Sequence, residues 1–133
     1  MQQGKLRHIA ISVPDVEKAA AFYESAFGLK RENESSIAIR LSDGTVNLTL
    51  LNFPTDADAG DERGKDFVGL HHIGIWVEDL AEAGERIRAS GGTFQSMEDA
   101  EIAIENAEHK YRDPCGIVID VSTRGWPGAR RDV

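Results

Sequence analysis

Apolar and polar residues alternate in two stretches of the chain that closely resemble each other. HIAISVPDV starts at His8, and HIGIWVEDL starts at His72, about half the chain further on. This period of two is typical of a β-strand that buries one face. Because successive side chains point to opposite faces, we expect both histidines to lie opposite the isoleucines. The repeat predicts two halves of similar structure.

Helix and hairpin signals follow each of these strands in the same order. Asp15 and Asp79 are predicted N-caps of helices over residues 16–26 and 81–89, and Gly28 and Gly92 are predicted at the helix ends, where a positive φ is needed. Strands over 36–41 and 46–51 flank the turn 42–44, and strands over 109–112 and 117–121 flank the turn 113–116. We therefore predict an α+β fold of two βαβββ modules that form a partly open sheet or barrel around a cleft.

The length of 133 residues fits one domain, residues 1–133. Within it we predict a first module over 5–53, a solvated linker over 54–67, a second module over 68–123 and a tail over 124–133. The polar stretch 96–108 has no counterpart in the first half and is predicted to be a loop or short helix near the site.

Composition excludes several classes of function. The formal net charge of -8 argues against nucleic-acid binding, and no apolar run approaches the ~18 residues of a membrane span. The N-terminus shows no secretory signal, and the single Cys115 agrees with a reducing compartment, so we expect a cytoplasmic protein without a membrane partner.

The same alternation places one carboxylate on the histidine face. In the last predicted strand the apolar positions are 117, 119 and 121, which leaves Asp120 on the opposite side. If both modules pack their helices on the isoleucine faces, His8, His72 and Asp120 point into a shared cleft. Two imidazoles and one carboxylate suit a divalent Fe, Mn, Ni, Co or Zn ion and leave coordination positions open for substrate.

The twin openings, together with AFYE from Ala21, FGL from Phe27 and YRDPCGIVID from Tyr111, resemble the vicinal oxygen chelate superfamily. That family includes glyoxalase I, methylmalonyl-CoA epimerase, extradiol dioxygenases and bleomycin-resistance proteins. The resemblance implies His8, His72 and Asp120 as metal ligands and a homodimer. Asp120 replaces the usual Glu. Thr49, with Asn47 on the same face, stands where relatives have a ligand or base, which disfavours proton transfer of the glyoxalase I kind.

Other side chains are candidates for the walls of the cleft. Thr49 and Asn47 are expected there, with His109 and with Trp76, for which core packing is an equal alternative. Tyr111 is a candidate catalytic residue that orients or protonates a bound oxygen, or else it packs across the strand pair.

Two further aromatic residues have more than one interpretation. His71 is expected on the isoleucine side, as a support of the site or a core residue rather than a ligand. For Trp126 in the tail we expect one of three roles: it covers the cleft, it contacts a partner subunit, or it belongs to a tail without a function.

These observations predict a metal-dependent enzyme that acts on a small substrate through two adjacent oxygen atoms. Dioxygenase and lyase or isomerase chemistries are nearly level, with dioxygenase slightly ahead because only three ligands are present. The alternative is a non-catalytic binding protein of the bleomycin-resistance kind, and a third possibility is a metal-bound fold that has lost its activity.

Overall fold

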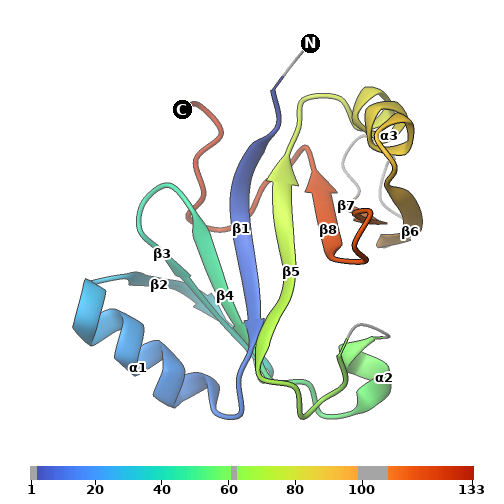
Figure 1. The fold of residues 1–133 in the computed structure, drawn as a ribbon. Helices are drawn as coiled ribbons and strands as arrows, with labels where there is room; N and C mark the ends of the chain where they lie inside the picture. Colours follow the sequence, from blue (N-terminus) through green and yellow to red (C-terminus); the bar gives the residue numbers. More distant parts are fainter. Residues whose placement is uncertain (1–2, 61–62, 99–107) are drawn as a thin grey trace.

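Each half of the chain folds into a strand, a helix and three further strands (Figure 1). The computed structural model describes residues 3–60, 63–98 and 108–133. The first half comprises β1 (Lys5–Ser12), α1 (Val16–Phe27), β2 (Lys30–Glu34), β3 (Ala38–Ser42) and β4 (Asn47–Leu51). The second comprises β5 (Gly69–Trp76), α3 (Leu80–Ala89), β6 (Thr93–Glu98), β7 (Glu108–Arg112) and β8 (Val118–Ser122). The predicted α+β fold of two βαβββ modules is confirmed.

The two modules share one sheet. Its strand order is β2-β3-β4-β1-β5-β8-β7-β6, and it is not closed into a barrel. β1 runs parallel to β4, β5 runs parallel to β8, and β1 pairs with β5 in antiparallel fashion. The modules therefore join within a single chain, along the two strands that carry the histidine repeat.

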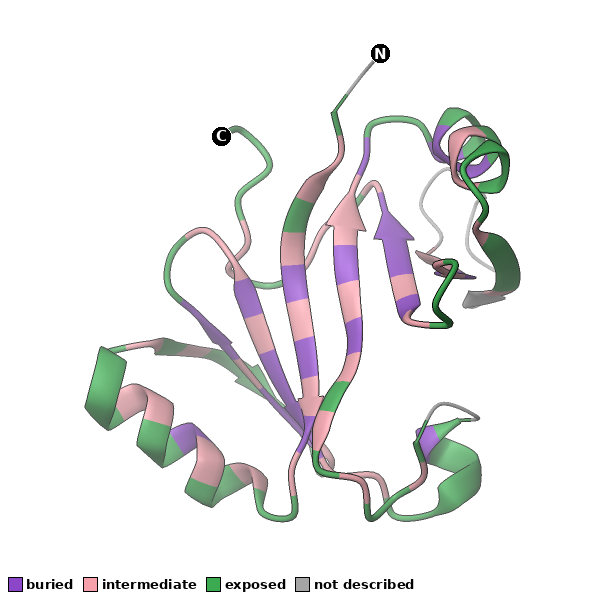
Figure 2. Ribbon diagram, in the orientation of Figure 1, coloured by how far each residue is buried: buried purple, intermediate pink, exposed green. Residues whose placement is uncertain are grey.

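The helices cover the outer strands of the sheet more than its centre. In the first module Ala20 of α1 packs with Ile39, Leu41 and Leu50, and in the second a separate core joins α3 to β7 and β8. The isoleucines of β1 and β5 are consequently only half-buried, whereas the histidine face of these strands is buried (Figure 2). We had expected the isoleucine face to be the buried one.

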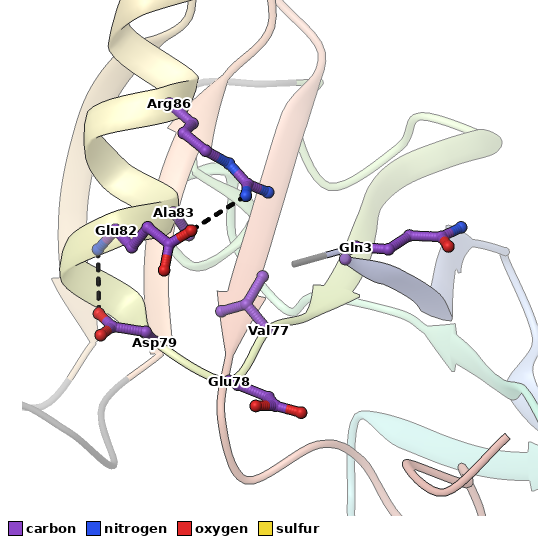
Figure 3. A pocket seen from close by; sticks show the side chains of 8 residues that line it. Gln3, Val77, Glu78, Asp79, Glu82, Ala83 and Arg86 are labelled. Atoms are coloured by element: carbon purple, nitrogen blue, oxygen red, sulfur yellow. Dashed lines mark hydrogen bonds and ion pairs between the residues drawn. The ribbon is translucent and has the colours of Figure 1, made fainter. Parts of the chain in front are cut away.

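The helix boundaries follow the predicted caps, with one correction. Asp15 accepts a hydrogen bond from the backbone N–H of Lys18, and Asp79 accepts one from Glu82 (Figure 3). Gly28 ends α1 with a φ of 70°. In α3 the positive φ falls on Gly91, not on Gly92. Gly92 is instead required by close packing, because a Cβ there would lie 2.5 Å from Ile87 Cγ2.

The linker contains structure that the sequence pattern did not show. A short helix, α2 (Asp56–Ala59), begins at the N-cap Thr55 and lies between β4 and β5. Of the polar stretch 96–108, the first residues extend β6 and residue 108 begins β7, and the rest lies outside the described residues. No helix in the described ranges is long and apolar enough to span a bilayer.

Candidate metal centre

Three adjacent strands at the middle of the sheet place His8, His72 and Asp120 together. His8 lies on β1, His72 on β5 and Asp120 on β8, and their exposed fractions are 5%, 8% and 2%. The strand register sets His8 and Asp120 on either side of Gly74, whose missing side chain leaves the space between them open to other groups. The predicted triad is therefore assembled within one chain and screened from solvent.

The polar atoms of the triad converge on one point. His8 Nε2 lies 3.0 Å from His72 Nε2, and His72 Nε2 lies 3.1 Å from Asp120 Oδ2. All three residues offer a ligand atom within 4.8 Å of the others. Two atoms bound at right angles to one metal ion at about 2.1 Å lie about 3 Å apart. The spacing of the triad thus fits ligands on one face of a coordination sphere.

The hydrogen bonds behind His8 determine which of its nitrogens carries the proton. The side-chain amide of Asn47 donates from Nδ2 to the carbonyl of Pro127, so its Oδ1 faces His8 Nδ1, at 2.7 Å. Because that oxygen can only accept, His8 Nδ1 is the donor. The Thr49 hydroxyl donates to the same oxygen at 2.7 Å. His8 therefore presents the lone pair of Nε2 to the triad.

A second relay acts on His72. His71 Nε2 lies 2.7 Å from the carbonyl oxygen of Ala59 and donates to it, so His71 Nδ1 accepts from His72 Nδ1, at 2.8 Å. Neutral His72 then also presents an Nε2 lone pair. We had expected His71 on the isoleucine side by alternation. A register shift between β1 and β5 at this point, where Ala10 pairs with His72 but Ile11 with Leu70, brings the two histidines together instead.

Charges around the triad keep it in the form that binds a cation. Burial, and then the charge that His72 carries when protonated, lower the pKa of His8 from 6.5 to about 4. Burial alone would raise the pKa of Asp120, but His72, whenever its ring is protonated, and the ammonium group of Lys110 hold it below its usual range. Lys110 Nζ lies 2.7 Å from Asp120 Oδ1. Two lone pairs and an ionised carboxylate therefore face one another, and a divalent cation fits this donor set.

The triad lies at the wall of a cleft of about 450 Å³, which is large enough for a small organic substrate. Thr49, Leu51 and Phe53 line it from the first module, and Glu108 and Lys110 from the second. α2 and the residue after it contribute Asp58, Ala59 and Gly60, and the tail contributes Trp126.

Two other hollows lack this chemistry. The one beside the start of α3, lined by Gln3, Val77 and Glu82 among others, has a volume of about 10 Å³ and holds at most one water (Figure 3). A cavity of about 540 Å³ beneath α3 is lined mainly by apolar residues of α3, β5 and β8.

Several predicted site residues lie elsewhere. Tyr111 pairs with Ile119 and packs in the core under α3, with its hydroxyl beside Gly84. His109 pairs with Val121 on that same face of the sheet, so neither side chain lines the cleft. Trp76 does not line it either, because its Nε1 donates to the carbonyl of Thr123 at the far end of β5. The structure thus places these three side chains outside the cleft, and for Tyr111 this is the packing across the strand pair that the sequence left open.

Of the two remaining candidates, one lines the cleft and the other supports a ligand of the triad from behind. Thr49 lines the cleft as expected, whereas Asn47 is completely buried behind His8 and acts on that ring from outside the cleft. Lys110 and Glu108 were missed. The predicted turn 113–116 would pair Lys110 with Ile119. In the structure residues 113–117 separate the paired strands, and this one-residue difference in register places Lys110 opposite Asp120.

Comparison with known proteins gives a consistent result. A model of the Glyoxalase/Bleomycin resistance protein/Dioxygenase superfamily matches residues 5–121. Human mitochondrial methylmalonyl-CoA epimerase is 36% identical over 91 residues, which cover 60% of this chain and 50% of the epimerase. The ethylmalonyl-CoA/methylmalonyl-CoA epimerase of Cereibacter sphaeroides is 31% identical over 96 residues, with coverage of 66% and 72%.

The match to the human epimerase thus spans half the length of that relative. Among solved structures, Streptomyces coelicolor methylmalonyl-CoA epimerase in complex with 2-nitronate-propionyl-CoA superposes with a TM-score of 0.69 at 18% identity, covering 90% of this chain and 94% of that one. The likeness to that structure concerns the fold.

Proposed function

The chain belongs to the Glyoxalase/Bleomycin resistance protein/Dioxygenase superfamily, and on this premise we propose that it is a metal-dependent enzyme. Its substrate is a small molecule that presents two neighbouring oxygen atoms to the cleft. The observation that carries the proposal is the convergence of His8 Nε2, His72 Nε2 and Asp120 Oδ2, because the hydrogen bonds at the far nitrogens of the two rings leave a lone pair on each Nε2. A bound divalent ion supplies a Lewis acid that stabilises negative charge on substrate oxygens.

Isomerase or lyase chemistry is our leading candidate. Both sequence relatives described above are epimerases, and the cleft contains side chains that can hold or move a proton. Glu108 and Lys110 line it from β7, on the strand next to Asp120. Relatives have a ligand or a base at the position of Thr49, but a threonine hydroxyl cannot act as a base at neutral pH. The residue that transfers the proton in this chain must therefore lie at another position.

Dioxygenase chemistry is a second candidate, and Thr49 is again the residue that favours it. With a hydroxyl there in place of a fourth protein ligand, three of the described residues hold the metal. Two histidines and one carboxylate with open positions are the ligand set of many non-haem Fe(II) oxygenases. A cytoplasmic location and a homodimer stay predictions.

The first test is the metal content of protein purified without an affinity tag of histidines. We expect near-stoichiometric Fe, Mn, Ni, Co or Zn in the wild type and its loss in Asp120→Ala and His72→Ala, by plasma mass spectrometry. Asp58→Ala is the matched control, because it removes another carboxylate of the cleft and leaves the triad intact. Absence of metal from the wild type even after reconstitution would sink the proposal.

The second test separates an enzyme from a binding protein and one chemistry from the other. Isomerase or lyase activity predicts exchange of a substrate proton with deuterated solvent, whereas dioxygenase activity predicts consumption of O₂. In both cases His72→Ala abolishes the signal. A ligand that binds equally well to wild type and His72→Ala, without turnover, would support the binding protein instead.

A further inference from the structure

The C-terminal tail returns from β8 to the first module and is held there by several hydrogen bonds. The carbonyls of Pro127 and Gly128 accept from Asn47 Nδ2 at 2.8 Å and from Ser42 Oγ at 2.7 Å. The backbone N–H of Arg130 donates to the carbonyl of Thr45 at 2.9 Å. Side chains of β1 hold the last residues, with Arg7 Nε donating to the carbonyl of Arg130 at 2.7 Å. The match to the family model ends at residue 121, before this tail begins.

Trp126 of the tail lies directly against a ligand of the candidate metal centre. Its ring stacks on the imidazole of His8, with centroids 4.9 Å apart and planes inclined by 5°. Its Nε1 donates to Glu108 Oε1 at 3.1 Å, on β7 of the second module. Trp126 therefore connects the first-module ligand His8 to the opposite wall of the cleft.

Gly74 leaves room for this indole on the sheet. Gly74 stands between His8 and Asp120 in the strand register, and a Cβ on it would lie 2.6 Å from Trp126 Cζ2 and 2.6 Å from His8 Cβ. Real Cβ atoms essentially never approach so closely. The indole thus occupies the space that the missing side chain opens next to the triad.

The tail also influences His8 through a hydrogen-bond chain that reaches Nδ1 of its ring. The Pro127 carbonyl orients the Asn47 amide, and the amide oxygen of Asn47 in turn receives the Nδ1 proton of His8. Two consecutive tail residues consequently restrain His8, one through the ring face and one through the tautomer. Ring orientation and tautomer are the properties by which outer groups control the affinity of a metal-bound histidine.

We propose that residues 124–133 are a built part of the metal centre and that Trp126 is a positioning residue for His8. The inference rests on the proposed function, since it assigns a role toward the bound metal. The stacked indole keeps the imidazole from rotating and covers one of its faces, so the Nε2 lone pair stays directed at the metal position.

The test measures Co²⁺ binding to metal-free protein by titration calorimetry. We expect Trp126→Ala to bind Co²⁺ about tenfold more weakly than the wild type, in line with the effect of removing an outer support of a metal ligand. Trp126→Phe retains a ring against His8 but loses the bond to Glu108 and part of the packing beside Gly74, so its affinity should lie nearer to that of the wild type than to that of Trp126→Ala. Thermal unfolding of each metal-free variant checks that the fold persists.

A spectroscopic readout isolates the contact. In Trp76→Phe, Trp126 is the remaining tryptophan, and stoichiometric Co²⁺ should quench its fluorescence because the indole lies on a metal ligand. Wild-type protein that binds no Co²⁺ overturns the proposed function together with this inference. Wild-type protein that binds Co²⁺, with Trp126→Ala equally tight or Trp126→Phe as weak as Trp126→Ala, overturns the inference alone.

Discussion

At the scale of single residues, each lone pair of the candidate site is set by a hydrogen bond on the far side of the same ring. Asn47 acts on His8, and His71 acts on His72 through a chain that ends at the carbonyl of Ala59. Neither supporting residue needs to touch a substrate for its loss to matter. Substitution of such supports typically costs a metal site 10–100-fold in affinity.

The lowered pKa of His8 predicts a pH dependence of stability for the metal-free protein. Its folded-state pKa of about 4 lies below the ordinary value of 6.5, so folding favours the neutral ring. The contribution is fully present above pH 6.5 and is lost as the pH falls toward 4. We expect a loss of about 3 kcal/mol in the free energy of unfolding over this range.

Urea unfolding of chelator-treated protein at several pH values measures this slope. His8→Gln is the matched control, since an amide at this position does not titrate and the other groups of the protein still do. An identical slope in His8→Gln and wild type would show that His8 makes no such contribution.

At the scale of elements, the local signals in the sequence located some segments well and others not at all. The two central strands and both long helices follow the alternation and the caps. β2 and β6 were not located, because most of the side chains whose burial is described in these edge strands are exposed or polar and show no period of two. An edge strand is defined by its partner, and its own sequence need not show it.

Removal of a cap tests the local origin of α3. Asp79→Ala deletes the carboxylate that accepts from the Glu82 N–H and should lower the free energy of unfolding by about 1 kcal/mol. Glu78→Ala, one residue earlier and exposed, is the control and should change stability little. Denaturant unfolding gives both values. Metal content should stay at the wild-type level, because α3 carries no ligand, and a loss of metal in Asp79→Ala would contradict this separation.

At the scale of the whole molecule, the pairing of β1 with β5 is the decisive feature. It sets the two histidines of the repeat on neighbouring strands of one chain, and β8 adds Asp120 on the other side of β5. The sequence alone left open whether the modules pair within a chain or between two chains. The structure forms the complete triad from one copy.

A metal centre built from one chain should bind metal independently of protein concentration. We expect the same dissociation constant for Co²⁺ across a dilution series that spans the monomer and any dimer, with sedimentation velocity reporting the oligomeric state. Affinity that falls in step with dimer dissociation would show that a second copy completes the site.

The sequence by itself determined the repeat, the caps and the three residues of the triad. Each of these depends on local rules, namely that strand side chains alternate and that a short polar side chain caps a helix. Because polar and apolar residues alternate without interruption after His8, after His72 and around Asp120, alternation alone was enough to assign these three residues to one face.

Only the tertiary structure decided what surrounds the triad. A register shift brings His71 to His72, pairing with β8 turns Tyr111 and His109 toward α3, and the path of the tail brings Trp126 onto His8. Register between strands and the course of a segment without periodicity are set by contacts between residues far apart in the chain. Such contacts leave no regular pattern in a single sequence.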